Sequence, residues 1–263
     1  MARLTAEPAA AASGALEIRV EGVSKAFGAV RAIEDVSLTV RPGEFVTLIG
    51  PSGCGKTSLL KIIGGLIAPD AGRVLIGGAP VRGPGPDRSM VFQDHALMPW
   101  ATVLRNVAFG LELRGTLRAE REDIAQRYID KVKLTGFERH YPHQLSGGMQ
   151  QRAGLARALA VNPRILLMDE PFASVDEQTR RLFQDDLLAV WGEERKTVAF
   201  VTHSMEEAIY LSDRVFVISP RPGRLAETLD VPLPRPRADH AVRGDPAFAQ
   251  LVERLWDTLK KLQ

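Results

Sequence analysis

The sequence contains too little cysteine for a disulfide framework or a cysteine-based metal site. Cys54 is the only cysteine among 263 residues. A single thiol can neither close an intrachain disulfide nor supply a cluster of sulfur ligands. The cysteine content therefore requires no oxidising compartment, and the cytosol is the expected location.

Long apolar runs and an excess of charge of one sign are also missing. Apolar runs such as Val215 to Ile218 have the length of a strand, far short of the roughly 18 residues that a membrane-spanning helix needs. The 34 basic and 32 acidic side chains leave a formal net charge of +2. A dedicated nucleic-acid binder usually carries a clear basic surplus, so the composition argues against a nucleic-acid partner.

The first fifteen residues do not form a secretory signal. They are rich in alanine, but Arg3 is the single early basic residue, and Glu7 and Pro8 interrupt the apolar stretch. We expect residues 1–15 to be a disordered tail.

The remaining pattern predicts an α/β fold. Residues 17–23 and 33–40 are strand-like, 45–49 is a short apolar strand, and a helical pattern begins at Lys56. From about 93 to 162 the pattern is mostly helical, with helices expected at 103–113, at 118–133 and from Ser146. Strands at 165–168, 197–201 and 214–218 then alternate with helices from Glu177 and Met205. We expect a parallel sheet with an added antiparallel part, in a domain of residues 16–240 that carries a helical subdomain at about 94–161.

Two further segments follow this core. Residues 220–237 are rich in proline and arginine, which predicts an extended connector without regular structure. Asp245 and Pro246 then introduce an amphipathic helix, expected within 241–263. Its apolar stripe, which includes Trp256, either docks on its own domain or contacts a membrane surface or a partner.

A glycine-rich loop follows the 45–49 strand and carries the strongest chemical signal. It fits the phosphate-binding pattern GxxxxGK[ST] between a strand and a helix. Backbone N–H groups of such a loop surround phosphate oxygens, the lysine adds charge, and the threonine hydroxyl can bind Mg²⁺. The alternative is a glycine-rich turn without a ligand. The predicted ATP-binding residues are Gly50, Pro51, Ser52, Gly53, Cys54, Gly55, Lys56, Thr57 and Ser58.

Two carboxylates end the apolar segment Ile165 to Met168. Asp169 and Glu170 stand at the carboxyl end of a buried strand, where open α/β sheets place their ligands. We expect Asp169 to hold Mg²⁺ and Glu170 to polarise the water that attacks the γ-phosphate. Capping of the next turn is the alternative role, but the phosphate-binding loop favours the catalytic one.

The segment from Leu145 to Arg152, which reads LSGGMQQR, narrows the choice among phosphate-loop NTPases. Ser146 can cap a helix whose first turn contains Gly147 and Gly148, which leaves its N–H groups accessible to a second anion. With the two motifs above, the chain resembles ABC ATPases over about residues 17–225. The resemblance implies that this segment, Gln150 included, closes on ATP bound to a second ATPase subunit, and we expect that subunit to be an identical copy.

Other positions match the order of motifs in that family. The resemblance implies that Gln93 binds Mg²⁺, takes part in catalysis and links the core to the helical subdomain. It also implies that His203 contacts the γ-phosphate and that Phe27 stacks on adenine. The segment 173–176 matches the loop that crosses the dimer, with Val175 where leucine is usual and Asp176 available for contact across the dimer.

The segments 94–100 and 106–111, and the later 222–224 and 233–237, look similar to importers of nitrate, sulfonate, taurine or bicarbonate. This resemblance implies an ATP-hydrolysing importer subunit that is peripheral to the cytoplasmic face of the inner membrane. Its implied partners are permease subunits, a second copy of the ATPase and, indirectly, a solute-binding protein. The exposed apolar run 97–100 suits a permease contact. The alternatives are a soluble ABC ATPase acting on DNA or ribosomes, and a regulator that binds ATP without hydrolysing it.

Overall fold

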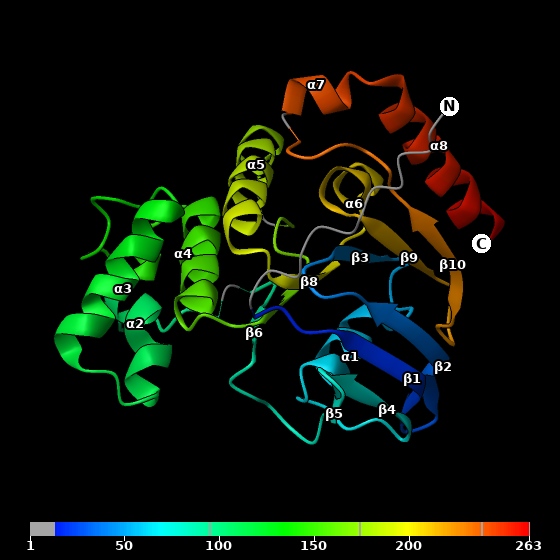
Figure 1. Ribbon diagram of the computed structural model, residues 1–263, viewed down its shortest axis with the longest axis horizontal. Helices are drawn as coiled ribbons and strands as arrows, with labels where there is room; N and C mark the ends of the chain where they lie inside the picture. Colours follow the sequence, from blue (N-terminus) through cyan, green and yellow to red (C-terminus); the bar gives the residue numbers. More distant parts are fainter. Residues whose placement is uncertain (1–13, 95, 174, 238, 263) are drawn as a thin grey trace, which may run out of the picture.

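A computed structural model describes residues 14–94, 96–173, 175–237 and 239–262. Most of the tail expected at 1–15 therefore lies outside the described residues. The described chain forms two β-sheets with helices between and around them (Figure 1). The described chain thus combines a largely parallel sheet with an added antiparallel sheet, as the sequence predicts.

The central sheet has six strands in the order β10-β9-β3-β8-β7-β6. Its parallel strands are β3 (Phe45–Ile49), β6 (Arg88–Val91), β7 (Ile165–Asp169), β8 (Thr197–Val201) and β9 (Arg214–Ile218). Every residue of β3, β7 and β8 is buried, which is typical of parallel strands covered on both faces. The five parallel strands bring their carboxyl ends to one edge.

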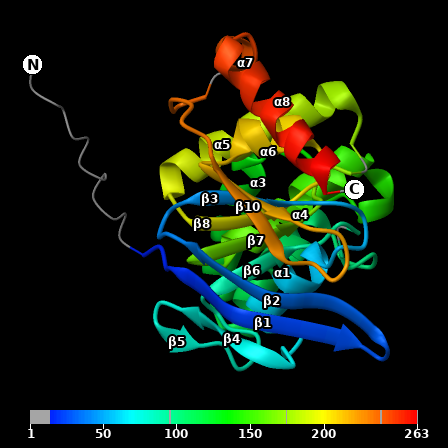
Figure 2. The same cartoon turned by 90° about the vertical axis from the view of Figure 1, so that its right-hand side faces the viewer.

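The second sheet is antiparallel and has the order β2-β1-β4-β5. Its strands are β1 (Ile18–Phe27), β2 (Val30–Val40), β4 (Ala71–Ile76) and β5 (Ala79–Pro80). Helix α1 (Lys56–Ile63) packs against strands of both sheets, and its apolar residues share one core with them (Figure 2). This position fixes the loop that precedes α1 between the two sheets.

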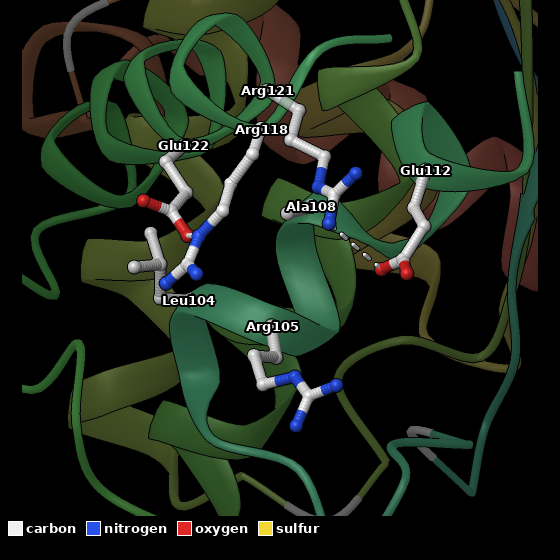
Figure 3. Close-up of a pocket in the computed structure, with 7 residues that line it drawn as sticks. All are labelled: Leu104, Arg105, Ala108, Glu112, Arg118, Arg121 and Glu122. Atoms are coloured by element: carbon white, nitrogen blue, oxygen red, sulfur yellow. Dashed lines mark hydrogen bonds and ion pairs between the residues drawn. The ribbon is translucent and has the colours of Figure 1, made fainter. Parts of the chain in front are cut away.

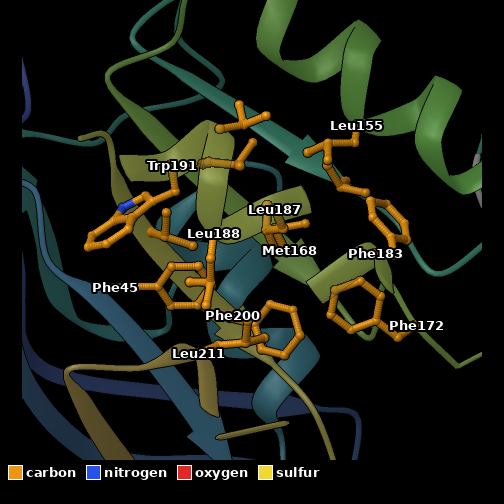
Figure 4. Packing of buried hydrophobic residues seen from close by; sticks show 14 of the residues in the cluster. Phe45, Leu155, Met168, Phe172, Phe183, Leu187, Leu188, Trp191, Phe200 and Leu211 are labelled. Carbon is orange, nitrogen blue, oxygen red and sulfur yellow. The ribbon is translucent and has the colours of Figure 1, made fainter. Parts of the chain in front are cut away.

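The helical subdomain consists of α2 (Val103–Leu113), α3 (Arg118–Lys131), the short 3₁₀ turn η1 (Pro142–Gln144) and α4 (Gly147–Ala160). It lies to one side of the central sheet in Figure 1. Helices α5 (Glu177–Glu194) and α6 (Met205–Leu211) pack on the face of the sheet away from α1. Figure 4 shows aromatic residues of this core, among them Phe45, Phe172, Phe183, Trp191 and Phe200.

The expectation for residues 220–237 was wrong in part. Residues Leu225–Asp230 form β10, which pairs antiparallel with β9 at the edge of the central sheet. Prolines occur on both sides of these six residues but not within them. Because only proline removes a backbone donor, the proline-free interval can form an edge strand.

The chain ends in α7 (Asp239–Arg243) and α8 (Pro246–Lys261). Asp245 caps α8 as expected, since its Oδ1 accepts a hydrogen bond of 2.8 Å from the backbone N–H of Ala247. Phe248 and Leu255 are buried in the core, so the helix docks on its own domain. Trp256 departs from the expected stripe and is 54% exposed. No helix within the described residues is both long and apolar enough to cross a membrane.

Candidate functional site

The predicted binding and catalytic residues lie at the edge of the central sheet where its parallel strands end. The glycine loop follows β3, Asp169 is the last residue of β7 with Glu170 directly after it, and His203 comes two residues after β8. Gln93 lies in an exposed turn just after β6. Strand order places β3, β8, β7 and β6 side by side, so residues far apart in sequence meet at the edge where ligands of open α/β sheets bind.

The glycine loop folds tightly around the ammonium of Lys56. Lys56 is only 6% exposed, and its Nζ donates to the carbonyl oxygens of Gly50 at 2.8 Å and Pro51 at 3.0 Å. Gly55 has φ of 102°, and a Cβ there would lie 2.9 Å from the carbonyl oxygen of Ala32. Glycine is therefore required by both conformation and space, and the loop encloses a positive charge.

A pocket of about 340 Å³ opens between this loop and the antiparallel sheet. Phe27 contributes an aromatic side chain that is 47% exposed, which leaves ring surface free for stacking. An aromatic ring beside a phosphate-binding loop suits a nucleotide, with its flat base and anionic tail. Arg221, which the sequence did not single out, also lines the pocket. The described lining residues are Phe27, Val30, Ala32, Ser52, Gly53, Gly55, Lys56, Thr57, Ser58, Glu170 and Arg221.

Two oxygen-bearing side chains form a pair suited to Mg²⁺. The Thr57 hydroxyl donates a 2.8 Å hydrogen bond to Asp169 Oδ1. Burial raises the pKa of Asp169 above its ordinary value, while the hydrogen bond from Thr57 acts in the opposite direction. A bound cation would favour the charged carboxylate. Hydroxyl and carboxylate oxygens are ligands that Mg²⁺ prefers, so the donor set fits this metal.

Glu170 and His203 contact each other beside the metal pair. His203 Nδ1 lies 3.0 Å from Glu170 Oε2, and the His203 side chain is 66% exposed. Glu170 has φ of 44°, a conformation that costs a non-glycine residue roughly 1–2 kcal/mol. Its backbone N–H donates to the carbonyl of Val201 at 3.0 Å, which fixes this turn to the end of β8. The turn presents the carboxylate to the nucleotide pocket.

The second glycine motif forms a different site. Ser146 caps α4, since its Oγ accepts a 3.3 Å hydrogen bond from Met149 N–H. Gln150 does not face outward, because its amide donates to the carbonyls of Pro142 and Leu145 and braces the loop. Ser146, Gly147 and Gly148 are not among the described residues that line the nucleotide pocket.

The loop expected to cross a dimer follows Phe172. Ser174 lies outside the described residues. Val175 is buried, and Asp176 caps α5 by accepting a 3.0 Å hydrogen bond from Thr179 N–H. A Cβ added to Gly148 would lie 3.2 Å from Thr179 Cγ2. The start of α4 therefore packs closely on the start of α5.

Comparison with known proteins places this geometry in context. The family described as "ABC transporter" matches residues 33–173. An uncharacterised ABC transporter ATP-binding protein of Methanocaldococcus jannaschii is 54% identical over 84% of this chain and 85% of its own length. A taurine import ATP-binding protein of Chromobacterium violaceum is 50% identical over 85% of this chain and 87% of its own length.

Solved structures agree with the sequence relatives. A dimeric bacterial ABC transporter cassette is similar at a TM-score of 0.73 and 33% identity, covering 81% of this chain and 98% of the cassette. The dimeric post-hydrolysis state of that cassette, bound to ADP and Pi, is similar at the same TM-score, identity and coverage.

Proposed function

Because the chain belongs to the ABC transporter family as an ATP-binding subunit with ATPase activity, we propose that it powers uptake of a small anion through a membrane permease. The observation that carries the proposal is the near-full-length similarity to a protein named for taurine import. We propose a solute of the nitrate, sulfonate or taurine type, delivered by a solute-binding protein. The subunit would work at the cytoplasmic face of the inner membrane.

We infer a division of labour among the pocket residues during hydrolysis. Phe27 stacks on adenine, while the N–H groups of residues 50–57 and the Lys56 ammonium bind the phosphates. Thr57, Asp169 and Gln93 would hold Mg²⁺, which neutralises developing charge on the phosphate oxygens when bound.

Glu170 and His203 would act on the reacting end of the nucleotide. Glu170 accepts a proton from the attacking water, and His203 orients that carboxylate and reaches toward the γ-phosphate. The 3.0 Å contact between their side chains supports this arrangement.

The separation of the two glycine motifs favours a dimer as the working unit. Ser146 and its glycines lie outside the pocket that Lys56 and Phe27 line in the same chain. Two copies arranged head to tail would place the start of α4 from each over the nucleotide of the other. ATP would close such a dimer, and hydrolysis would let it reopen and move the permease.

The helical subdomain offers the surface for the permease. A groove of about 370 Å³ lies between α2 and α3, lined by charged side chains of both helices (Figure 3). Arg118 pairs with Glu122 at 2.8 Å, and Arg121 with Glu112 at 3.6 Å. Trp100 stands in the nearby segment with 76% of its surface exposed, whereas Leu97 packs on the core. The exposed indole supports a partner contact, although the expected run 97–100 is only partly exposed.

The proposal is tested by capture from gently solubilised membranes. Tagged Glu170→Gln is incubated with Mg-ATP to hold the closed state, and Lys56→Ala serves as a matched bait that should not bind nucleotide. We expect a multi-span permease with the first bait, and binding of taurine, sulfonates or nitrate by the solute-binding protein that functions with that permease. Ribosomal or DNA-associated partners without a membrane protein would overturn the transporter proposal.

A further inference from the structure

Arg221 reaches the nucleotide pocket from the fifth parallel strand. It follows β9, the neighbour of β3 on the side away from β8. The strands are in register, with Ile49 opposite Val217, so the loop after β9 emerges beside the glycine loop after β3. The loop after β9 thus places an arginine at the same sheet edge as the other predicted binding and catalytic residues.

The Arg221 side chain contacts the glycine loop directly. Its Nε and Nη2 donate to the carbonyl oxygen of Gly53 at 3.2 Å and 3.1 Å. A Cβ on Gly53 would lie 2.9 Å from Arg221 Nη2, so the guanidinium packs against the backbone of the loop. Five N–H donors belong to a guanidinium, and one carbonyl cannot use them all.

The backbone that carries Arg221 is tightly held. Gly223 N–H donates to the carbonyl of Ala32 at 2.9 Å, and Glu34 N–H donates to the carbonyl of Gly223 at 3.0 Å. A Cβ on Gly223 would lie 2.0 Å from the carbonyl oxygen of Cys54. The loop after β9 is therefore fixed to both the glycine loop and β2, so Arg221 projects from a rigid base.

Two cationic side chains, Lys56 and Arg221, are among the described residues that line the pocket. We propose that Arg221 is a positioning residue that holds the glycine loop through Gly53 and adds positive charge beside the nucleotide phosphates. This inference rests on the proposed role of residues 50–57 in ATP binding. An exposed guanidinium beside a polyphosphate gains modest affinity that salt screens.

The experiment compares ADP and ATP binding to Arg221→Gln, Arg221→Lys and wild type by calorimetry at several salt concentrations. We expect Arg221→Gln to weaken binding about three- to tenfold and to flatten the dependence of affinity on salt. Compared with Arg221→Gln, Arg221→Lys should regain the salt dependence of wild type but only part of its affinity for ADP and ATP. An ammonium cannot reproduce the two hydrogen bonds that the guanidinium donates to the carbonyl of Gly53. In steady-state hydrolysis KM for ATP rises, while kcat changes less than twofold.

Two further variants distinguish a failure of the Arg221 proposal from a failure of the proposed ATP-binding loop. Arg73→Gln removes an exposed arginine of β4 that pairs with Glu21, and it should bind ADP as wild type does. Lys56→Ala should abolish binding, and wild-type affinity in that variant would refute the ATP-binding loop itself. Affinity of Arg221→Gln within twofold of wild type, or a loss with an unchanged salt dependence, would overturn the role of Arg221 alone. Should Arg221→Gln fail to fold, Arg221→Met removes the charge while keeping a long side chain, and a salt dependence equal to that of wild type in this variant would refute the charge contribution.

Discussion

The Asp169 side chain shows a conflict between folding and function at a single residue. Burial raises the pKa of its carboxyl, so the folded chain holds this proton more tightly than the unfolded chain does. Stability therefore falls as pH rises from about 4 through the folded-state pKa, and it stays lower at neutral pH. In the proposed function, a bound Mg²⁺ would offset the cost of an ionised Asp169.

We predict that Asp169→Asn raises the melting temperature at pH 7 without metal and nucleotide. The amide oxygen can still accept the hydrogen bond of Thr57, while the buried charge is removed. The difference from wild type should shrink as pH falls through the folded-state pKa toward about 4, because the buried Asp169 carboxyl then becomes protonated and neutral. Adding Mg-ATP should reverse the order, because the amide is a poorer Mg²⁺ ligand. Thermal unfolding with and without Mg-ATP measures both effects, and an unchanged order would contradict the metal role.

A substitution at Glu170 should separate ATP binding from ATP hydrolysis. Glu170→Gln should keep ATP affinity within about threefold, because size and hydrogen-bonding capacity are largely preserved. Hydrolysis should fall by roughly 10²–10⁴-fold, the usual contribution of a general base. Phosphate release and equilibrium ATP binding are the two measurements, with Glu253→Gln at an exposed position of α8 as the matched carboxylate control. Near-normal turnover would remove Glu170 from the role of base.

Sequence patterns identify site residues well when the chemistry is contiguous. Residues 50–57 and the pair Asp169 and Glu170 stand in short patterns whose chemistry depends on immediate neighbours. Arg221 could not be found in this way, since it meets Gly53 across 168 positions and only the alignment of β9 with β3 brings them together. The one sequence feature that could have indicated Arg221 as a site residue is its position shortly after a predicted parallel strand.

Among the elements, the segment between β6 and α2 depends on one buried side chain. Asn106, on α2, is fully buried; its Oδ1 accepts from Met98 N–H at 2.8 Å. Its Nδ2 donates to the carbonyls of Met98, Ala101 and Thr102 at 3.0–3.1 Å. This clamp fixes the chain that follows Gln93 and leads to the exposed Trp100.

Asn106→Ala should lower the free energy of unfolding by roughly 2–3 kcal/mol, because it leaves several buried backbone groups without partners. Urea unfolding measures the loss. Arg105→Ala is the matched control on the same helix, since its side chain is exposed and its change should stay within about 0.5 kcal/mol. Equal stability of the two variants would show that the clamp does not stabilise this segment.

Element prediction succeeded where apolar periodicity was strong. The strand at 45–49 and the helix at 103–113 have the predicted bounds, because buried strands and amphipathic helices leave clear patterns. β4 was not predicted, since Ala71 and Gly72 follow a proline-containing turn and resemble its continuation. β10 was hidden by flanking prolines, and only pairing with β9 makes it a strand.

At the scale of the whole molecule, the proposed function assigns the chain two half-sites for ATP that do not meet. The pocket at Lys56 does not include Gly147 and Gly148 of the second motif, which are half-buried at the start of α4. The similar cassettes of known structure are dimeric. Closure of two copies around ATP would satisfy both half-sites at once.

We therefore predict that a negative charge introduced at the start of α4 prevents dimer formation with ATP. Glu170→Gln should shift from a monomer of 28.8 kDa to a dimer with Mg-ATP but not with ADP. Adding Gly147→Asp should prevent this shift, because a carboxylate would face the phosphates of the partner's nucleotide. Aspartate is favourable in the first turn of a helix, so the monomer should stay folded and keep its ATP affinity.

The matched control adds Ala119→Asp, an exposed position in the first turn of α3, to Glu170→Gln. It introduces the same charge at another helix start and should leave the dimer intact. Light scattering coupled to size-exclusion chromatography gives the mass of each variant. A dimer that persists with Gly147→Asp would mean that the second glycine motif does not face ATP across the subunits, and each nucleotide would then have to be enclosed by its own chain.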